Sequence, residues 1–199
     1  MGPIPTRFAF ALPGWLVELA AGESRVFATR TARMRFVIEM ARRNVCERSG
    51  GPFGAAVFDA AGRLVAPGVN LVASRSCSIL HAEIVAIALA QRRLGAFDLS
   101  EGGQRDCELV ASAEPCAMCF GAVPWSGVTR LVCGARDEDV RRIGFDEGAK
   151  LPDWQDALKA RGVRVWRDVR RREAVAVLAL YAASGGPIYN GGGSRPPRR

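Results

Sequence analysis

Three side chains in this sequence have the types and spacing of a metal site. Cys116 and Cys119 stand three residues apart in "PCAMC", so both thiols share one face at the start of a helix. The positive end of the helix dipole favours the thiolate form that binds metal. His81, the only histidine of the chain, supplies a third ligand. Two thiolates and one imidazole leave the fourth corner of a tetrahedral zinc ion open for water, which is the pattern of a catalytic site.

A carboxyl group stands beside this ligand set. Glu83 lies two residues after His81, and the ten residues that follow it contain no other carboxylate. Two residues span about 200° of helical turn, so both side chains reach one metal only at the helix entrance. We interpret Glu83 as a proton shuttle between a zinc-activated water and a substrate. The alternatives for these residues taken singly are a core histidine, two buried thiols and an acid favoured by a helix N-terminus.

The segment after Glu83 predicts a rigid element that positions these groups. Residues 84–90 are apolar, Arg92 and Arg93 suit a helix C-terminus, and Gly95 marks a stop. A helix that is apolar nearly all round is buried on several sides. Burial of this helix would hold the ligand and the acid in place with little water around them.

Alternating patterns along the chain predict the rest of the fold. Helical periodicity covers 32–45, and a short helix opens after Glu114 with Pro115 in its first turn. The sequence predicts a three-layer α/β/α domain with a central mixed five-stranded sheet. The predicted strands are a hairpin of 54–59 and 63–70, then 106–113, 128–135 and 163–168, and the further helices are 136–144, 152–162 and 172–183.

Composition narrows the class of protein. Hydrophobic residues make up 49% of the 199 residues, and no apolar run approaches the ~20 residues that span a bilayer. The start of the chain lacks the features of a secretory leader, so we expect a cytoplasmic location and reduced cysteines. The net charge of +8 permits nucleic-acid binding. No aromatic residues interleave with the arginines, and we therefore favour a solvated basic surface and expect no nucleic-acid or membrane partner.

The motifs "HAE" and "PCAMC" together resemble the signature of the cytidine-deaminase-like superfamily of zinc enzymes. The chain is most similar in its motifs to bacterial guanine deaminases of that fold. The resemblance implies an N-terminal extension (1–30), a zinc-dependent deaminase domain (31–183) and a C-terminal tail (184–199) that caps an active site. The matching stretches are "GGPFGAAV", "PGVN", "HAEIVAI", "SAEPCAMCFGAVPWSG", "GFDEG" and "GGPIYN".

The resemblance also implies roles for individual residues. Asn70 would hydrogen-bond a purine, and Glu147 would be a second carboxylate near the leaving amino group. Many family members have aspartate at the position of Glu147, which leaves the preferred ring open. The remaining implied substrate contacts are Phe53, Ala82, Trp125 and Tyr189, with Tyr189 in a cap that often covers the partner subunit's site. A homodimer with a domain swap is therefore implied as well.

The activity implied by the resemblance is hydrolytic deamination of a free nucleobase, with guanine converted to xanthine and ammonia in purine catabolism. Zn²⁺ is the expected cofactor. Three rival functions stay open at this point. They are tRNA adenosine deamination, deamination of another small ring (cytosine, a nucleoside, a pterin or an aminotriazine), and a catalytically silent zinc-binding or scaffold role.

Overall fold

A five-stranded mixed sheet forms the centre of the protein. The computed structural model describes residues 4, 6–22, 26–101 and 105–190. The sheet has the order β2-β1-β3-β4-β5, in which β1 pairs antiparallel with β2 and β3, while β3, β4 and β5 run parallel. The strands are β1 (Gly54–Phe58), β2 (Leu64–Val69), β3 (Glu108–Ala113), β4 (Arg130–Ala135) and β5 (Arg164–Trp166).

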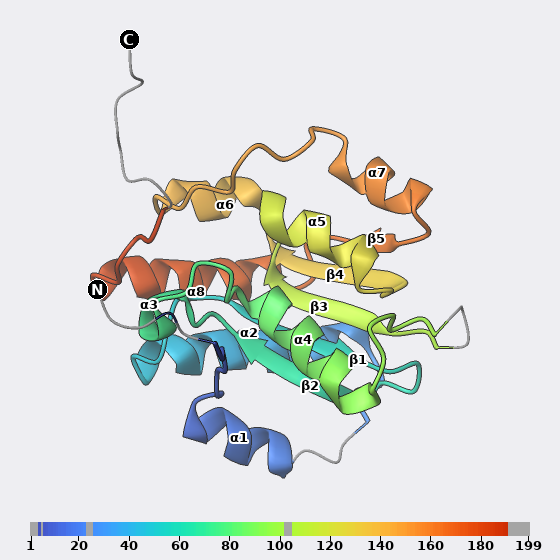
Figure 1. The fold of residues 1–199 in the computed structure, drawn as a ribbon. Helices are drawn as coiled ribbons and strands as arrows, with labels where there is room; N and C mark the ends of the chain where they lie inside the picture. Colours follow the sequence, from blue (N-terminus) through green and yellow to red (C-terminus); the bar gives the residue numbers. More distant parts are fainter. Residues whose placement is uncertain (1–3, 5, 23–25, 102–104, 191–199) are drawn as a thin grey trace.

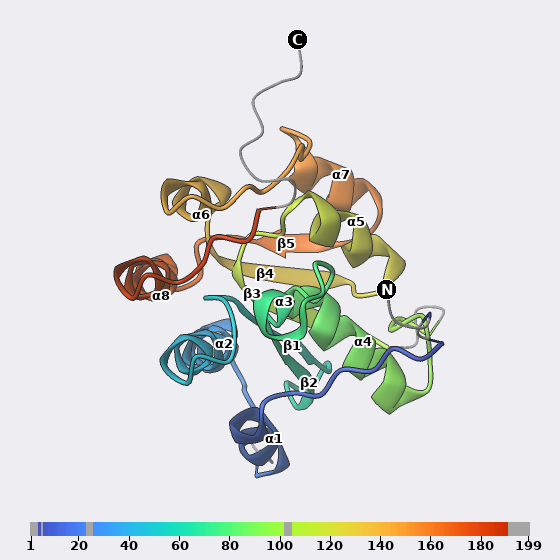
Figure 2. The same ribbon diagram turned by 60° about the vertical axis from the view of Figure 1, so that its left-hand side comes forward.

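Helices cover both faces of this sheet (Figures 1 and 2). Helices α2 and α8 pack on one face, and α4, α5 and α7 belong to the other. The predicted three-layer α/β/α architecture is therefore confirmed. The helices are α1 (Gly14–Ala21), α2 (Arg30–Cys46), α3 (Val72–Arg75), α4 (Ala82–Leu94), α5 (Ala117–Trp125), α6 (Asp137–Arg142), α7 (Trp154–Ala160) and α8 (Arg171–Ala183).

Alternation along the strands divides the core into two clusters. In β1, Ala56 and Phe58 face the α2 and α8 layer, whereas Ala55 and Val57 face the α4 layer. All five residues of β1 are buried because successive side chains of a strand point to opposite faces and both faces are covered. The continuous apolar character of the strand follows from this position.

Helix α4 lies unusually close to the sheet. A Cβ atom at Gly68 of β2 would come within 2.3 Å of the Ala82 carbonyl oxygen and 2.6 Å of the Ala86 nitrogen. Glycine therefore permits the first turn of α4 to rest directly on β2. The helix ends as predicted, because Gly95 adopts φ 65° and its N–H bonds to the Gln91 carbonyl. None of the residues 82–90 is exposed, as expected of an apolar helix.

The two ends of the chain pack on this domain. Helix α1, within the predicted N-terminal extension, buries Leu16 completely, and Trp15 Nε1 donates to Ser49 Oγ at 3.1 Å. Residues 184–190 of the predicted tail are described, and 191–199 lie outside the described residues. Pro115 was expected in the first turn of α5. It stands instead one residue before Cys116, which is the N-cap of that helix. Among the described residues, no helix has the length and apolar character needed to cross a membrane.

Candidate active site

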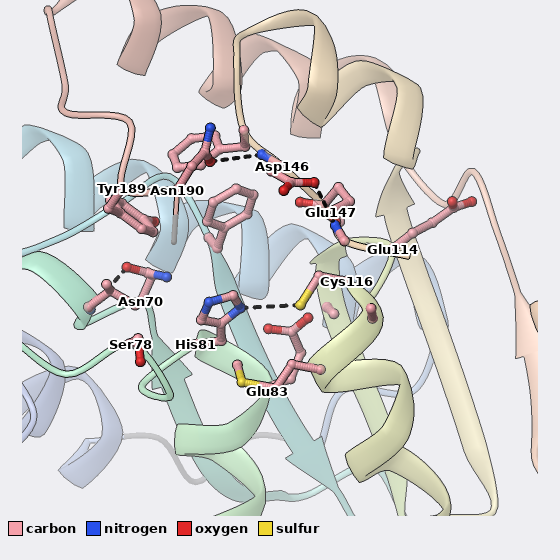
Figure 3. Close-up of a pocket in the computed structure, with 18 of the residues that line it drawn as sticks. Asn70, Ser78, His81, Glu83, Glu114, Cys116, Asp146, Glu147, Tyr189 and Asn190 are labelled. Atoms are coloured by element: carbon pink, nitrogen blue, oxygen red, sulfur yellow. Dashed lines mark hydrogen bonds between the residues drawn. The ribbon is translucent and has the colours of Figure 1, made fainter. Parts of the chain in front are cut away.

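The structure brings His81, Cys116 and Cys119 together at one end of the sheet. Figure 3 shows His81 beside Cys116. His81 is the N-cap of α4 and has an extended backbone. Cys116 is the N-cap of α5, which follows β3, and Cys119 lies in the first turn of that helix. Both helix N-termini therefore point their ligands at one position. His81 is partly buried, and the two cysteines are 8% and 0% exposed.

The spacing of these atoms fits zinc. His81 Nδ1 lies 3.5 Å from Cys116 Sγ and 3.6 Å from Cys119 Sγ. Tetrahedral zinc with bonds of about 2.3 Å to sulfur and about 2.0–2.1 Å to nitrogen separates the two ligand atoms by about 3.5 Å. The three residues therefore have the donor types and the mutual distances of a three-ligand zinc site with a fourth position for water. No other such group of three metal-binding side chains occurs among the described residues.

The two thiols are electrostatically unequal when no metal is bound. The Cys119 hydrogen bond lowers the pKa of Cys116 to about 4, with a further contribution from His81. The same contact, together with burial, raises the pKa of Cys119 well above its ordinary value. Burial opposes the charged form of His81, but its bond to Cys116 and the nearby Glu83 raise its pKa overall. One thiolate is thus already present before metal binding.

Glu83 projects from the first turn of α4 into the same site. Its side chain is buried, and burial raises its pKa to about 7, with the charge of Cys116 adding to the effect. His81 and Glu83 are two residues apart, so their side chains reach one metal only at the entrance of the helix. The geometry satisfies this, because His81 is the cap with extended backbone and Glu83 is already helical. A carboxyl group with a pKa near neutrality suits both accepting and donating a proton.

Glu147 supplies a second buried carboxyl group. It lies in the segment between α6 and α7, and its backbone carbonyl accepts a 2.9 Å hydrogen bond from the Ala117 N–H. Burial, together with the negative charges of Cys116 and Glu83, raises the pKa of Glu147 to about 8. Two carboxyl groups with raised pKa values therefore face one cavity. Such pairs are characteristic of functional sites.

The cavity in front of the zinc ligands has a volume of about 360 Å³. This volume lies within the range of small-molecule sites, about 300–1,000 Å³. Of the residues expected to contact substrate, Phe53, Asn70 and Tyr189 line this cavity, as do Glu83 and Glu147. Figure 3 shows Asn70 and Tyr189 on the side of the cavity opposite Glu147.

Hydrogen bonds and ring contacts fix these walls. Asn70 Oδ1 accepts the Val72 N–H at 3.2 Å, which leaves the amide nitrogen to face the cavity. Phe145 joins two of the aromatic residues, with ring centroids 5.2 Å from Phe53 and 4.9 Å from Tyr189. The tail thus closes the cavity of its own chain with an aromatic ring. The hydroxyl group of Tyr189 is buried against this wall.

Two of the expected substrate contacts lie elsewhere. Trp125 is 78% exposed at the far end of α5, where Arg161 lies over its ring at 5.7 Å. The expectation that Trp125 lines the pocket of its own chain is therefore not met, because nine residues of helix carry it about 13 Å from the zinc-binding end. Ala82 is the first residue of α4. It is buried against Gly68 of β2 and is not part of the cavity lining.

Several polar residues of the site were not anticipated. Ser78, Ser112, Glu114, Asp146 and Asn190 also line the cavity. Asn190 Oδ1 accepts the Asp146 N–H at 2.8 Å, and Asn190 Nδ2 donates to the Gly144 carbonyl at 2.9 Å. The stretches "GFDEG" and "PIYN" contained Asp146 and Asn190. Only the folded chain shows that one stretch binds the other.

Comparison with known proteins agrees with this geometry. The sequence profile of the cytidine and deoxycytidylate deaminase zinc-binding region matches residues 28–135. The guanine deaminase of Bacillus subtilis (strain 168) is 39% identical over 98 residues, which cover 49% of this chain and 59% of that protein. The matched region thus spans less than two thirds of this curated relative.

Solved structures extend the similarity to nearly the whole chain. A guanine deaminase from Nitrosomonas europaea is 49% identical with a TM-score of 0.86, and the match covers 92% of this chain and 100% of that one. A further structure, solved in complex with 8-azaguanine, is 48% identical with a TM-score of 0.86 and the same coverage. The profile match includes all three zinc ligands and Glu83. The chain therefore belongs to the cytidine and deoxycytidylate deaminase family of zinc-binding proteins.

Proposed function

We propose that this chain is a zinc-dependent guanine deaminase, which hydrolyses guanine to xanthine and ammonia. The observation that carries the proposal is one cavity that holds a three-ligand zinc site and two buried carboxyl groups of raised pKa. The names of the Bacillus and Nitrosomonas relatives support guanine as the base. The complex of a similar protein with 8-azaguanine supports a purine-shaped pocket.

The chemistry divides between the metal and the two acids. His81, Cys116 and Cys119 would hold the zinc ion, which would supply an activated water for attack on the amino-bearing carbon of the ring. Glu83 accepts the proton of that water and delivers it to the adjacent ring nitrogen, which makes the carbon electrophilic. The pKa of about 7 allows Glu83 to perform both transfers near neutral pH.

Glu147 serves the departing amino group in this proposal. Burial raises the pKa of its carboxyl group, which favours the protonated form able to donate. From the side of the cavity opposite Asn70, Glu147 would donate its proton to the amino nitrogen as ammonia leaves. It would be reprotonated by the new hydroxyl group of the ring as that group becomes the carbonyl. Glu83 is the alternative donor for this step.

The walls of the cavity favour a free base over a polynucleotide. Asn70 presents its amide N–H groups to a ring carbonyl or ring nitrogen, and Phe53 borders the ring. Tyr189 and Asn190 of the tail line the cavity, and an aromatic wall of this kind suits a small ring better than a nucleic-acid strand. We therefore expect no nucleic-acid substrate.

We also propose that the protein is a homodimer. Exposed apolar side chains gather near α5, where the 97–99 segment is joined to the end of the helix by the Leu99 N–H bond to the Ser126 carbonyl. Met118, Trp125 and Phe97 are 38%, 78% and 85% exposed. Light scattering should give twice the 21.4 kDa chain mass, and a monomer at micromolar concentration would contradict the proposal. The tail lines the cavity of its own chain, and the exchange of tails between two subunits stays a prediction. The cytoplasmic location stays a prediction.

The function is tested by a substrate panel with protein of measured metal content. Ammonia release is followed with guanine, adenine, cytosine, guanosine, a pterin and an aminotriazine, and inosine formation is followed with tRNA. We expect one zinc per chain, xanthine from guanine, and at least tenfold lower kcat/KM for every other substrate. Faster release from another ring, or inosine in tRNA, would replace guanine deamination with the corresponding activity.

A further inference from the structure

A buried lysine joins the loop of Glu147 to the turn that carries the zinc ligands. Lys150 Nζ donates to the Pro115 carbonyl at 3.0 Å, and its side chain is 6% exposed. Pro115 directly precedes the ligand Cys116. The Ala117 N–H, directly after Cys116, donates to the Glu147 carbonyl at 2.9 Å. Two hydrogen bonds therefore connect these segments on either side of Cys116.

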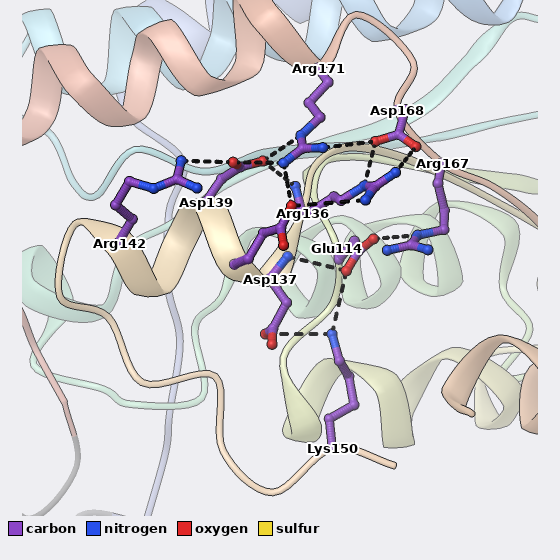
Figure 4. A network of polar contacts seen from close by, with 10 residues as sticks. Glu114, Arg136, Asp137, Asp139, Arg142, Lys150, Arg167, Asp168 and Arg171 are labelled. Carbon is purple, nitrogen blue, oxygen red and sulfur yellow. Dashed lines mark hydrogen bonds and ion pairs between the residues drawn. The ribbon is translucent and has the colours of Figure 1, made fainter. Parts of the chain in front are cut away.

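The charge of Lys150 is neutralised by a network behind the site (Figure 4). Its ammonium group lies 3.8 Å from Glu114 Oε2 and 3.6 Å from Asp137 Oδ1. The Glu114 side chain is 2% exposed, pairs with Arg167 and accepts the Asp137 N–H at 3.1 Å. A buried ammonium group is stable only with such partners. Glu114 therefore ties Lys150 to the end of β3 and to the start of α6.

No regular secondary structure holds the loop that this lysine joins. Residues 145–148 are neither helix nor strand. Gly148 adopts φ 70°, and a Cβ atom there would lie 3.0 Å from the Ala117 Cβ, so the loop lies directly against α5. The position of the Glu147 carboxyl group relative to Cys116 thus depends on specific contacts of this loop. Lys150 makes one of them, at the C-terminal end of the loop, through its hydrogen bond to the Pro115 carbonyl.

We propose that Lys150, held by Glu114, is a positioning residue for Glu147 in the deamination reaction. This inference rests on the proposed function. Lys150 touches neither the zinc ligands' donor atoms nor the cavity, since it is absent from the cavity lining. It acts through the placement of Glu147. A displacement of about 1 Å in such a group is enough to cost on the order of 100-fold in rate.

A double-mutant cycle tests the proposal. Lys150→Met removes the donor and the charge but keeps the length of the side chain. We expect it to lower kcat for guanine on the order of 100-fold, with zinc content retained and KM changed less than threefold. In the Glu147→Gln background the same substitution should change kcat less than twofold, because its effect passes through Glu147. Equal losses in both backgrounds, or a loss of zinc, would overturn the proposal.

The chain provides a matched control, since Lys159 is its only other lysine and is exposed on α7. Lys159→Met should leave kcat and zinc content unchanged. If Lys150→Met melts more than 10 °C below the parent protein, the cycle is made with Glu114→Gln. We then expect about a tenfold loss of kcat that disappears in the Glu147→Gln background, and a persistent loss contradicts the proposal. A parent protein inactive on guanine overturns the proposed function instead.

Discussion

The two carboxyl groups of the site, those of Glu83 and Glu147, both have raised pKa values, but different parts of the structure hold them in position. Burial is the main cause of the raised pKa of both Glu83 and Glu147. Glu83 belongs to a helix whose first turn rests on β2 at Gly68. Glu147 belongs to a loop without regular secondary structure, held by hydrogen bonds that involve Ala117, Arg141, Lys150 and Asn190. One acid is positioned by the main architecture of the fold, and the other by a few side chains.

This difference separates what the fold must preserve from what it is free to adjust. Moving Glu83 requires moving α4, and with it His81 and the zinc site. Moving Glu147 requires only a change in the loop or in the tail. We therefore expect substrate choice to be easier to alter at Glu147 than at Glu83. Substitutions of these residues and of their contacts should therefore differ in their effects on kcat and stability.

Substitution of Glu83 has the largest expected effect. Glu83→Gln removes the proton shuttle but keeps the helix and the three zinc ligands, so we expect kcat for guanine to fall about 10,000-fold. Zinc measured by atomic emission should stay at one per chain. Guanine turnover within tenfold of the parent rate would refute the assignment of Glu83.

Substitution of Glu147 has a smaller effect in this view, since Glu83 is able to deliver the final proton. Glu147→Gln should lower kcat about 1,000-fold with zinc retained. The comparison with Glu83→Gln, made by steady-state ammonia release, ranks the two acids. A larger loss for Glu147→Gln than for Glu83→Gln would reverse the roles proposed for them.

The tail contact tests whether the loop is held from outside. Asn190→Ala removes both bonds to the loop, from Asp146 N–H and to the Gly144 carbonyl. We expect kcat to fall about tenfold, because Glu147 loses one support while Glu83 keeps its helix. Arg172→Ala on the exposed face of α8 is the control and should be silent. An Asn190→Ala protein that loses zinc would show that the tail supports the metal site as well.

The smallest effect concerns stability after metal removal. The Glu147 pKa is about 8 in the folded, metal-free chain against a reference of 4.5, so the folded state binds more protons between these values. The contribution of Glu147 to the free energy of unfolding therefore falls as pH rises through this window. Glu83 also titrates in this window, and the pKa of Cys116 is lowered to about 4 on folding, so both groups add their own pH dependence. The test is therefore the difference in Tm between the parent and the Glu147→Gln protein. Metal-free Glu147→Gln should gain about 5 °C in Tm over the metal-free parent between pH 5 and pH 9.

A difference that stays constant with pH would show that the Glu147 carboxyl group is not protonated in the folded chain. The measurement is a thermal melt at matched ionic strength, with the chelator removed before heating. Zinc-loaded samples of the same two proteins serve as the reference.

The features of the site that depend on residues close together in the sequence could be predicted. His81 and Glu83 at a helix entrance, and Cys116 with Cys119 at another, follow from spacing within five residues. The apolar run 84–90 with its stop at Gly95 predicted the first helix, and the motif after Glu114 predicted the second. The order of the layers followed from alternation. These features depend on short-range geometry, which a sequence expresses directly.

The contacts that hold the site depend on distant segments. Lys150 meets Pro115 across 35 positions, and Asn190 meets Asp146 across 44. No sequence motif or periodicity around Lys150 or Asn190 predicts which distant residue each one contacts. Trp125 lies outside the cavity of its own chain, and the short motif around it does not state which way α5 runs from the cavity. Its role as a substrate contact stays a prediction. Only the folded chain decides such long-range relations.

The solitary imidazole at the metal gives the protein a built-in reporter. His81 is the only histidine of the chain and lies in the zinc site. In protein without a histidine tag, the imidazole nitrogen signals in a nuclear magnetic resonance spectrum therefore come from His81 alone. Their chemical shifts should report the fraction of chains with zinc bound, with no need to assign the spectrum. Acylation of histidine has one target per chain, and bound metal should shield it. An affinity tag of histidines would hide this signal, which makes a different purification handle the better choice.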